Sequence, residues 1–137
     1  MAAMANWLFK TEPDDYSYAD LERDRCTVWD GVKNNWALKN LREVKKGDQA
    51  LIYHTGKERA IAGMATVVSD PYPDPQADDP KLVVVDVEPA GSWAQPVTLA
   101  TIKADPRFSD FALVKFSRLS VKPVPSKIWR DLKKLGH

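Results

Sequence analysis

Short stretches in which apolar residues alternate with polar ones, or fill every position, indicate several strands. In the first, over 7–10, Trp7 and Phe9 fall on one face and Lys10 on the other. The stretch over 49–54 is apolar at both alternating sets of positions, which predicts a strand covered on both sides. Further strands are predicted over 27–29, 60–68, 82–87 and 119–124.

Helices are predicted where a capping residue precedes an apolar stripe at helical spacing. The first has Ser17 as its cap, with Asp20 three residues later, and ends before Thr27. Three more are expected to begin after caps at Asn34, Thr98 and Ser126. The third is stopped by a proline at 106, and the last ends at Gly136.

Glycine and proline divide these elements in a way that favours a closed or curled sheet. Gly63, within the strand over 60–68, predicts a bulge or a sharp bend. The segment over 70–80 is rich in proline and is expected to be a loop. We therefore predict an α+β fold, a small mixed or antiparallel β-barrel with short peripheral helices. A chain of 137 residues supports one such domain.

Charge is balanced overall but uneven along the chain. The chain has 20 Lys and Arg residues against 19 Asp and Glu residues. This balance excludes a protein that binds polyanions through its overall charge. The segments over 33–46 and 122–134 each carry five basic residues against one acidic residue, whereas 70–88 is acidic. These basic segments could orient a phosphate backbone, or they could simply be the solvated faces of helices.

Few residues are available for metal binding or for catalysis. Cys26 is the only cysteine, which excludes an internal disulfide and favours the reducing cytoplasm, or the nucleus of a eukaryote. We expect no metal and no cofactor, and no apolar run is long enough to span a membrane. His54 is the one internal histidine, so an enzyme acting on RNA or nucleotides with His54 as general base stays an alternative.

The group of residues that most favours a binding site combines aromatic rings with hydrogen-bonding side chains. Rings stack on a nucleobase, and donors and acceptors beside them select which base fits. The same aromatic residues could instead be ordinary core, and a small-molecule or protein-binding domain is a further alternative. The group comprises Trp29, Tyr53 and His54 with Lys10, Thr11, Lys33, Asn34 and Ser120.

Two motifs, WLFKTEP over 7–13 and VWDGVKN over 28–34, resemble the EVE domain family. Shorter matching pieces lie in the family's order over 47–48, 53–55, 61–63, 72–75, 96–99 and 119–121. Each piece is weak alone, but their order and spacing are specific. The resemblance covers a single domain over 7–135, which leaves 1–6 as a flexible N-terminus.

The resemblance implies a PUA-like fold, related to YTH domains, that binds DNA or RNA carrying a modified base without performing catalysis. The modified base would be a methylated or hydroxymethylated cytosine or adenine held in an aromatic pocket. Lys33 stands where the family commonly has arginine, Thr11 where it has serine, and Asn35 and Trp36 also depart from its pattern. Carried over by position, the pocket consists of Lys10, Thr11, Trp29, Gly31, Val32, Lys33, Asn34, Tyr53, His54, Leu119 and Ser120.

Overall fold

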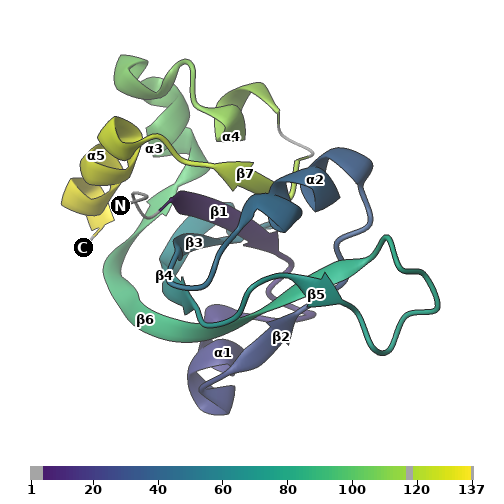
Figure 1. The fold of residues 1–137 in the computed structure, drawn as a ribbon. Helices are drawn as coiled ribbons and strands as arrows, with labels where there is room; N and C mark the ends of the chain where they lie inside the picture. Colours follow the sequence, from purple (N-terminus) through teal and green to yellow (C-terminus); the bar gives the residue numbers. More distant parts are fainter. Residues whose placement is uncertain (1–4, 117–118, 137) are drawn as a thin grey trace.

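One curled, mixed sheet forms the centre of the protein in a computed structural model that describes residues 5–116 and 119–136 (Figure 1). Its strand order is β2-β6-β4-β3-β1-β7, and β5 pairs with β6 outside this path. β1 and β3 run parallel, and the other pairings are antiparallel. The strands are β1 (Asn6–Thr11), β2 (Thr27–Trp29), β3 (Gln49–His54), β4 (Ala60–Val67), β5 (Tyr72–Pro73), β6 (Val83–Thr98) and β7 (Val121–Pro123).

Short helices surround this sheet, and three of their predicted caps are confirmed. The Ser17 hydroxyl accepts a hydrogen bond of 3.1 Å from the Asp20 N–H, and the Asp20 carboxylate accepts one of 2.9 Å from the Ser17 N–H. Asn34 and Thr98 cap their helices through side-chain oxygens. The helices are α1 (Tyr18–Asp24), α2 (Asn35–Glu43), α3 (Leu99–Ala104), α4 (Ala112–Lys115) and α5 (Ser126–Gly136), with a 3-10 turn η1 (Pro106–Phe108).

The last helix differs from its prediction at both ends. Ser126 is the first residue of α5 and does not precede it as a cap. The Trp129 N–H donates a hydrogen bond of 2.9 Å to the carbonyl of Pro125, so Pro125 is the residue that precedes the helix. Gly136 is the final helical residue and is buried. A Cβ atom at this position would overlap the ring of Trp93, so glycine here permits close packing.

β6 is much longer than predicted and accounts for the curl of the sheet (Figure 1). The strand expected to end at Val87 continues to Thr98, and it pairs in turn with β2, β5 and β4. The register between β4 and β6 shifts next to Gly63, which confirms the predicted bulge. A Cβ atom on Gly63 would lie 2.7 Å from the Tyr18 ring and 2.8 Å from the Gly91 carbonyl. The predicted strand over 119–124 is reduced to the three residues of β7.

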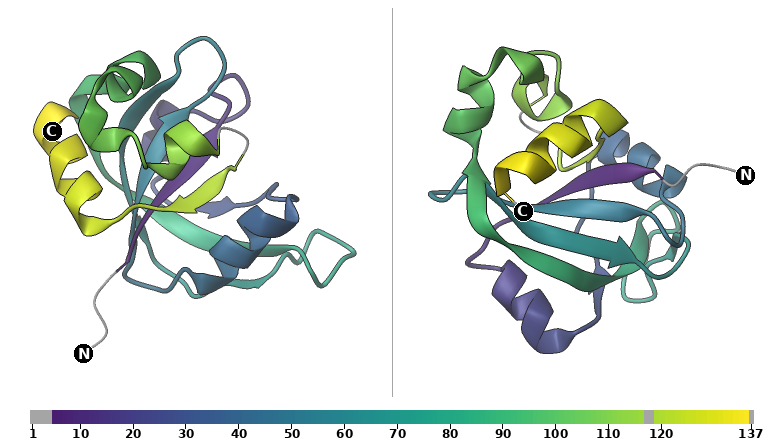
Figure 2. Two further views of the ribbon diagram at one scale, coloured as in Figure 1. Left: turned by 90° about the horizontal axis from the view of Figure 1, so that it is seen from above. Right: turned by 90° about the vertical axis from the view of Figure 1, so that its left-hand side faces the viewer.

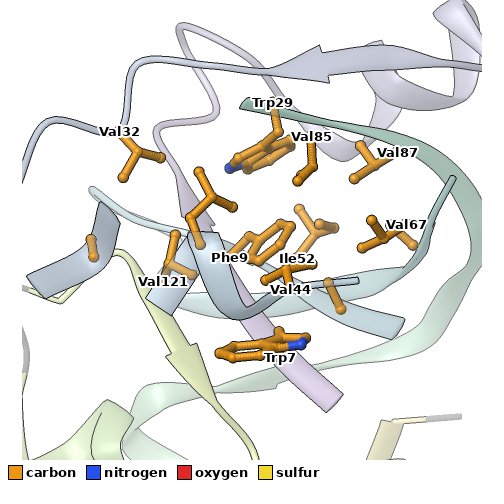
Figure 3. Close-up of a cluster of buried hydrophobic side chains, with 14 of the residues drawn as sticks. Trp7, Phe9, Trp29, Val32, Val44, Ile52, Val67, Val85, Val87 and Val121 are labelled. Carbon is orange, nitrogen blue, oxygen red and sulfur yellow. The ribbon is translucent and has the colours of Figure 1, made fainter. Parts of the chain in front are cut away.

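Two separate hydrophobic cores lie on the two faces of the sheet. Figure 2 shows α3, α4 and α5 on one face and α2 with β2 on the other. Side chains alternate between the faces, so Phe9 enters the core under α2, drawn in Figure 3, whereas Leu8 and Tyr53 enter the core under α5. β3 is therefore covered on both sides, as predicted.

The first strand begins at Asn6, one residue before the predicted domain boundary. Asp48 holds this end of the chain: its carboxylate accepts hydrogen bonds from the Ala5 N–H at 3.1 Å and from the Trp7 indole N–H at 2.9 Å. Within the part of the chain that the structure describes, no helix is long and apolar enough to cross a membrane.

Candidate functional site

A cavity of about 540 Å³ opens where β1 ends and where the chain leaves β2. Its volume lies within the range of small-molecule sites. Six of the predicted pocket residues line it: Lys10, Thr11, Trp29, Gly31, Val32 and Ser120. Six further residues line it that the sequence analysis did not assign to a site: Glu12, Asp15, Tyr16, Thr27, Val28 and Asp30.

Trp29 forms an apolar wall of this cavity. Its indole is only 7% exposed and packs against Phe9, with ring centroids 5.6 Å apart (Figure 3). The Tyr16 ring meets it edge-on, with centroids 6.3 Å apart and planes at 85°. Trp29 and Tyr16 therefore both line the cavity, whereas Tyr53, the second aromatic wall predicted from the sequence, does not.

Two hydrogen bonds hold Tyr16, one at its backbone carbonyl and one at its hydroxyl. The Thr11 hydroxyl donates a hydrogen bond of 2.7 Å to the Tyr16 carbonyl, and the Tyr16 hydroxyl donates one of 2.9 Å to Asp24. Burial raises the pKa of Tyr16, so the phenol stays neutral. A signal for this position existed in the sequence, because Tyr16 directly precedes the helix cap at Ser17.

Carboxylates outnumber cations around the cavity. Among the described residues, Glu12, Asp15 and Asp30 line it together with one basic residue, Lys10. Carboxylates repel phosphate groups but accept hydrogen bonds from exocyclic amino groups such as N4 of cytosine. The cavity therefore suits the edge of a nucleobase better than it suits a phosphate.

The ammonium group of Lys10 lies on the side of β1 away from Trp29. Its Nζ atom is 5.5 Å from the centre of the Tyr53 ring, its partner in the parallel register of β1 and β3. Burial lowers the pKa of Lys10, and a hydrogen bond with Lys122 opposes that shift. The Lys10 backbone N–H donates a hydrogen bond of 2.9 Å to the carbonyl of Ser120, which ties β1 to the chain before β7.

Lys122 was counted in a basic segment and is instead fully buried. Its Nζ atom donates a hydrogen bond of 3.1 Å to the Phe116 carbonyl. Burial, with the charge of Lys10 as the next cause, lowers the pKa of Lys122 to about 7. The assignment to a charged surface was therefore wrong for this residue, since periodicity in a three-residue strand does not reveal which side faces the core.

His54 lies outside the cavity and has a structural role. The Tyr18 N–H donates a hydrogen bond of 2.9 Å to Nε2 of His54, and Nδ1 lies 2.6 Å from a Glu58 carboxylate oxygen. Because Nε2 accepts, Nδ1 carries the proton and donates to Glu58. Both nitrogens of this imidazole, which is 6% exposed, are occupied by protein groups, so the geometry does not favour His54 as a general base.

The remaining predicted site residues are also placed outside the cavity lining. Asn34 caps α2, with its side-chain oxygen accepting a hydrogen bond of 3.1 Å from the Ala37 N–H. Lys33 is exposed, and Leu119 is buried in the core beneath α2. Trp36 is 47% exposed and packs edge-on against Phe116, with centroids 4.8 Å apart. Among the described residues, no cluster of His, Cys, Asp and Glu side chains could hold a metal ion.

The curled mixed sheet and its short peripheral helices define an α+β fold of the PUA-like class. The chain belongs to the EVE domain family, whose sequence model matches residues 5–135. This match confirms the family resemblance of the sequence motifs.

Individual relatives support the same assignment. The NMR structure of Rpa0253 from Rhodopseudomonas palustris is 38% identical, with a TM-score of 0.92 over 97% of this chain and 93% of that one. Thymocyte nuclear protein 1 of Danio rerio is 30% identical in an alignment that covers 90% of this chain and 68% of that protein. Human THYN1 protein, solved in complex with 5-methylcytosine-containing DNA, is 28% identical, with a TM-score of 0.88 over 96% of each chain.

Proposed function

We propose that this protein binds nucleic acid carrying a modified base, that the base enters the Trp29 cavity, and that the protein acts as a binding domain and not as an enzyme. The observation that carries the proposal is a cavity with a buried indole wall and a rim of hydrogen-bond acceptors. The complex of human THYN1 protein with methylated DNA supports 5-methylcytosine in DNA as the first ligand to test.

The cavity offers a contact for each part of such a base. The rings of Trp29 and Tyr16 supply apolar faces, and base stacking on an aromatic ring contributes roughly 1–3 kcal/mol. The carboxylate of Asp30 or Asp15 accepts from the N4 amino group, as acidic side chains do with cytosine. Val28 and Val32 present the apolar surface that a 5-methyl group needs.

The expected preference follows from the size of the modification. Burying one methyl group contributes about 0.8 kcal/mol, which corresponds to about a fourfold difference in affinity. Removing the base from its stack costs a few kcal/mol, whether or not the base is methylated. The preference for the modified base is therefore expected to be modest.

Equilibrium binding to matched short oligonucleotides tests the proposal. The set contains DNA and RNA, plain or carrying one methylated or hydroxymethylated cytosine or adenine, at two salt concentrations. We expect a preference for a modified base of about fourfold or more and weaker binding at higher salt. Equal affinity for plain and modified strands would overturn the proposal.

A matched pair of variants locates the bound base. Trp29→Phe reduces the aromatic wall of the cavity, and Trp36→Phe makes the same change on an exposed tryptophan outside the cavity lining. We expect Trp29→Phe to reduce the preference for the modified base and Trp36→Phe to leave it unchanged. The reverse pattern would place the base at the Trp36 surface and contradict the proposal.

A further inference from the structure

A second hollow, of about 290 Å³, lies at the other side of the β1–β3 pair. Its apolar wall comes from Tyr53 and Leu113, which belong to the core under α5, whereas Trp29 and Val32 belong to the core under α2. Lys10 lines both the cavity and this hollow. The two sites are therefore adjacent and share a residue, although they open on different faces of the sheet.

Three cationic side chains converge on this basic hollow from three different elements. Lys10 comes from the end of β1, Arg59 from the loop between β3 and β4, and Lys103 from α3. The loop and α3 are joined by a hydrogen bond of 2.7 Å from the Leu99 N–H to the Arg59 carbonyl. This backbone hydrogen bond therefore fixes the relative positions of the two segments that carry Arg59 and Lys103.

The guanidinium of Arg59 has hydrogen-bonding capacity for a ligand. Its Nε–H donates a hydrogen bond of 3.2 Å to the carbonyl of Gly56, which occupies one of five donor hydrogens. Burial raises the pKa of Tyr53, and the positive charge of Arg59 acts against that shift. Arg59 and Tyr53 both line the hollow, so the positive charge lies beside its aromatic wall.

Two carboxylates, of Glu58 and Glu12, lie at the same loop but do not line the hollow. Glu58 belongs to the loop, and its carboxylate lies 2.6 Å from Nδ1 of His54. A carboxylate oxygen of Glu12 accepts a hydrogen bond of 3.2 Å from the Thr55 hydroxyl, and Thr55 lines the hollow. Among the described residues, three cations line the hollow and these two carboxylates do not, which leaves an excess of positive charge. The cavity on the other face has the opposite balance, with three carboxylates and Lys10.

We propose that the basic hollow binds a phosphate group of the same nucleic acid strand whose base occupies the Trp29 cavity. A strand that inserts a base there must place its adjoining phosphates elsewhere, because the acidic rim of the cavity repels them. The hollow next to Lys10 offers a planar guanidinium and two ammonium groups, which are the usual phosphate partners. This inference rests on the proposed function, because it supplies that same site with its phosphate contact.

The salt dependence of binding by the full chain tests this inference. The probe is a short DNA duplex with one 5-methylcytosine, compared with the same duplex unmethylated. Each phosphate contact that is lost lowers the slope of log affinity against log salt by about one. We expect the variant with both Arg59→Ala and Lys103→Ala to lose about one in slope while keeping the preference for the methylated duplex.

Charge-matched controls make this result specific. Lys45 and Lys46 are exposed and precede the start of β3, at the end opposite Tyr53. Replacing both with alanine removes the same charge, and we expect the slope to stay as in the unaltered protein.

A neutral linkage in the DNA gives an independent readout. A methylphosphonate beside the 5-methylcytosine removes one phosphate charge, and we expect it to weaken binding by the unaltered protein but not by the Arg59→Ala and Lys103→Ala variant. The inference would be overturned if that variant kept the salt slope of the unaltered protein and its sensitivity to the neutral linkage, even where the base preference is intact. If the unaltered protein showed no preference for the methylated duplex, this result would instead contradict the proposed function.

Inorganic phosphate and a free mononucleotide separate a strand phosphate from a small-molecule ligand. We expect both probes to bind far more weakly than the duplex, because neither places a base and a backbone phosphate in the two sites together. Binding of the mononucleotide as tightly as the duplex would overturn the assignment to a nucleic acid strand.

Discussion

The ring of Tyr16 meets the indole of Trp29 edge-on at 6.3 Å, and the two residues come from opposite sides of α1 in the sequence. Trp29 is fixed in the core, whereas Tyr16 is half-buried and stands at the cavity. This division of roles makes Tyr16 the aromatic residue that can be altered with the least effect on folding.

Tyr16→Ala is expected to weaken binding of a modified-base oligonucleotide by about fivefold or more, since a stacking contact contributes roughly 1–3 kcal/mol. Tyr16→Phe keeps the ring and loses only the hydrogen bond to Asp24, so its affinity is expected to stay close to that of the unaltered protein. Fluorescence anisotropy measures both. Equal losses in the two variants would show that the hydroxyl and not the ring is required.

His54→Ala is expected to reduce stability and to leave the base preference unchanged. The substitution removes the acceptor for the buried Tyr18 N–H, and an unsatisfied buried donor costs about 1–3 kcal/mol. Urea denaturation measures the loss. Glu58→Gln keeps an acceptor near Nδ1 and serves as the milder control. A His54→Ala protein of normal stability that has lost binding would contradict the structural role.

Lys122 makes stability depend on pH in a direction that can be predicted. Its pKa is about 7 in the folded protein and about 10.4 when unfolded, so between these values the unfolded chain binds more protons. Stability contributed by this group is therefore lowest below pH 7 and rises with pH up to about 10. The limiting slope is about 1.4 kcal/mol per pH unit.

A Lys122→Met variant isolates this contribution. Its free energy of unfolding is expected to rise less steeply than that of the unaltered protein between about pH 7.5 and 9. Lys127→Met replaces an exposed lysine of α5 and is expected to keep the pH dependence of the unaltered protein. Parallel pH profiles for all three proteins would show that Lys122 is not titrating in this range.

Gly63→Ala tests the close approach of β4, β6 and α1. The added Cβ would lie 2.7 Å from the Tyr18 ring, and overpacking of this kind costs about 1–3 kcal/mol. A double-mutant cycle with Tyr18→Ala checks the cause, because removing the ring is expected to reduce the cost of the glycine substitution. Additive losses in urea denaturation would contradict a clash between these two residues.

Local signals in the sequence predicted the starts of α1, α2 and α3 because a helix cap depends on a few neighbouring residues. Ser17 and Asp20 form the expected reciprocal pair, and Asn34 caps as predicted. Gly63 likewise marked a bulge, since a glycine in a strand signals close backbone contact.

The face on which a residue lies was harder to predict. Tyr53 was grouped with Trp29, yet the two belong to different cores, because the parallel register pairs Tyr53 with Lys10. The full length of β6 also escaped prediction. Its second half has a polar, proline-containing pattern, and pairing with β4 holds it extended despite that pattern. Both features depend on contacts between distant segments, which local periodicity does not contain.

The position of the bound base is tested most directly by NMR with DNA in which the 5-methyl group of one cytosine carries a 13C label. In the complex, we expect the methyl resonance to shift and to show NOEs to ring protons of Tyr16 and Trp29, which line the cavity. A complex in which the methyl group shows NOEs only to residues outside the cavity would contradict binding of the base in the Trp29 cavity.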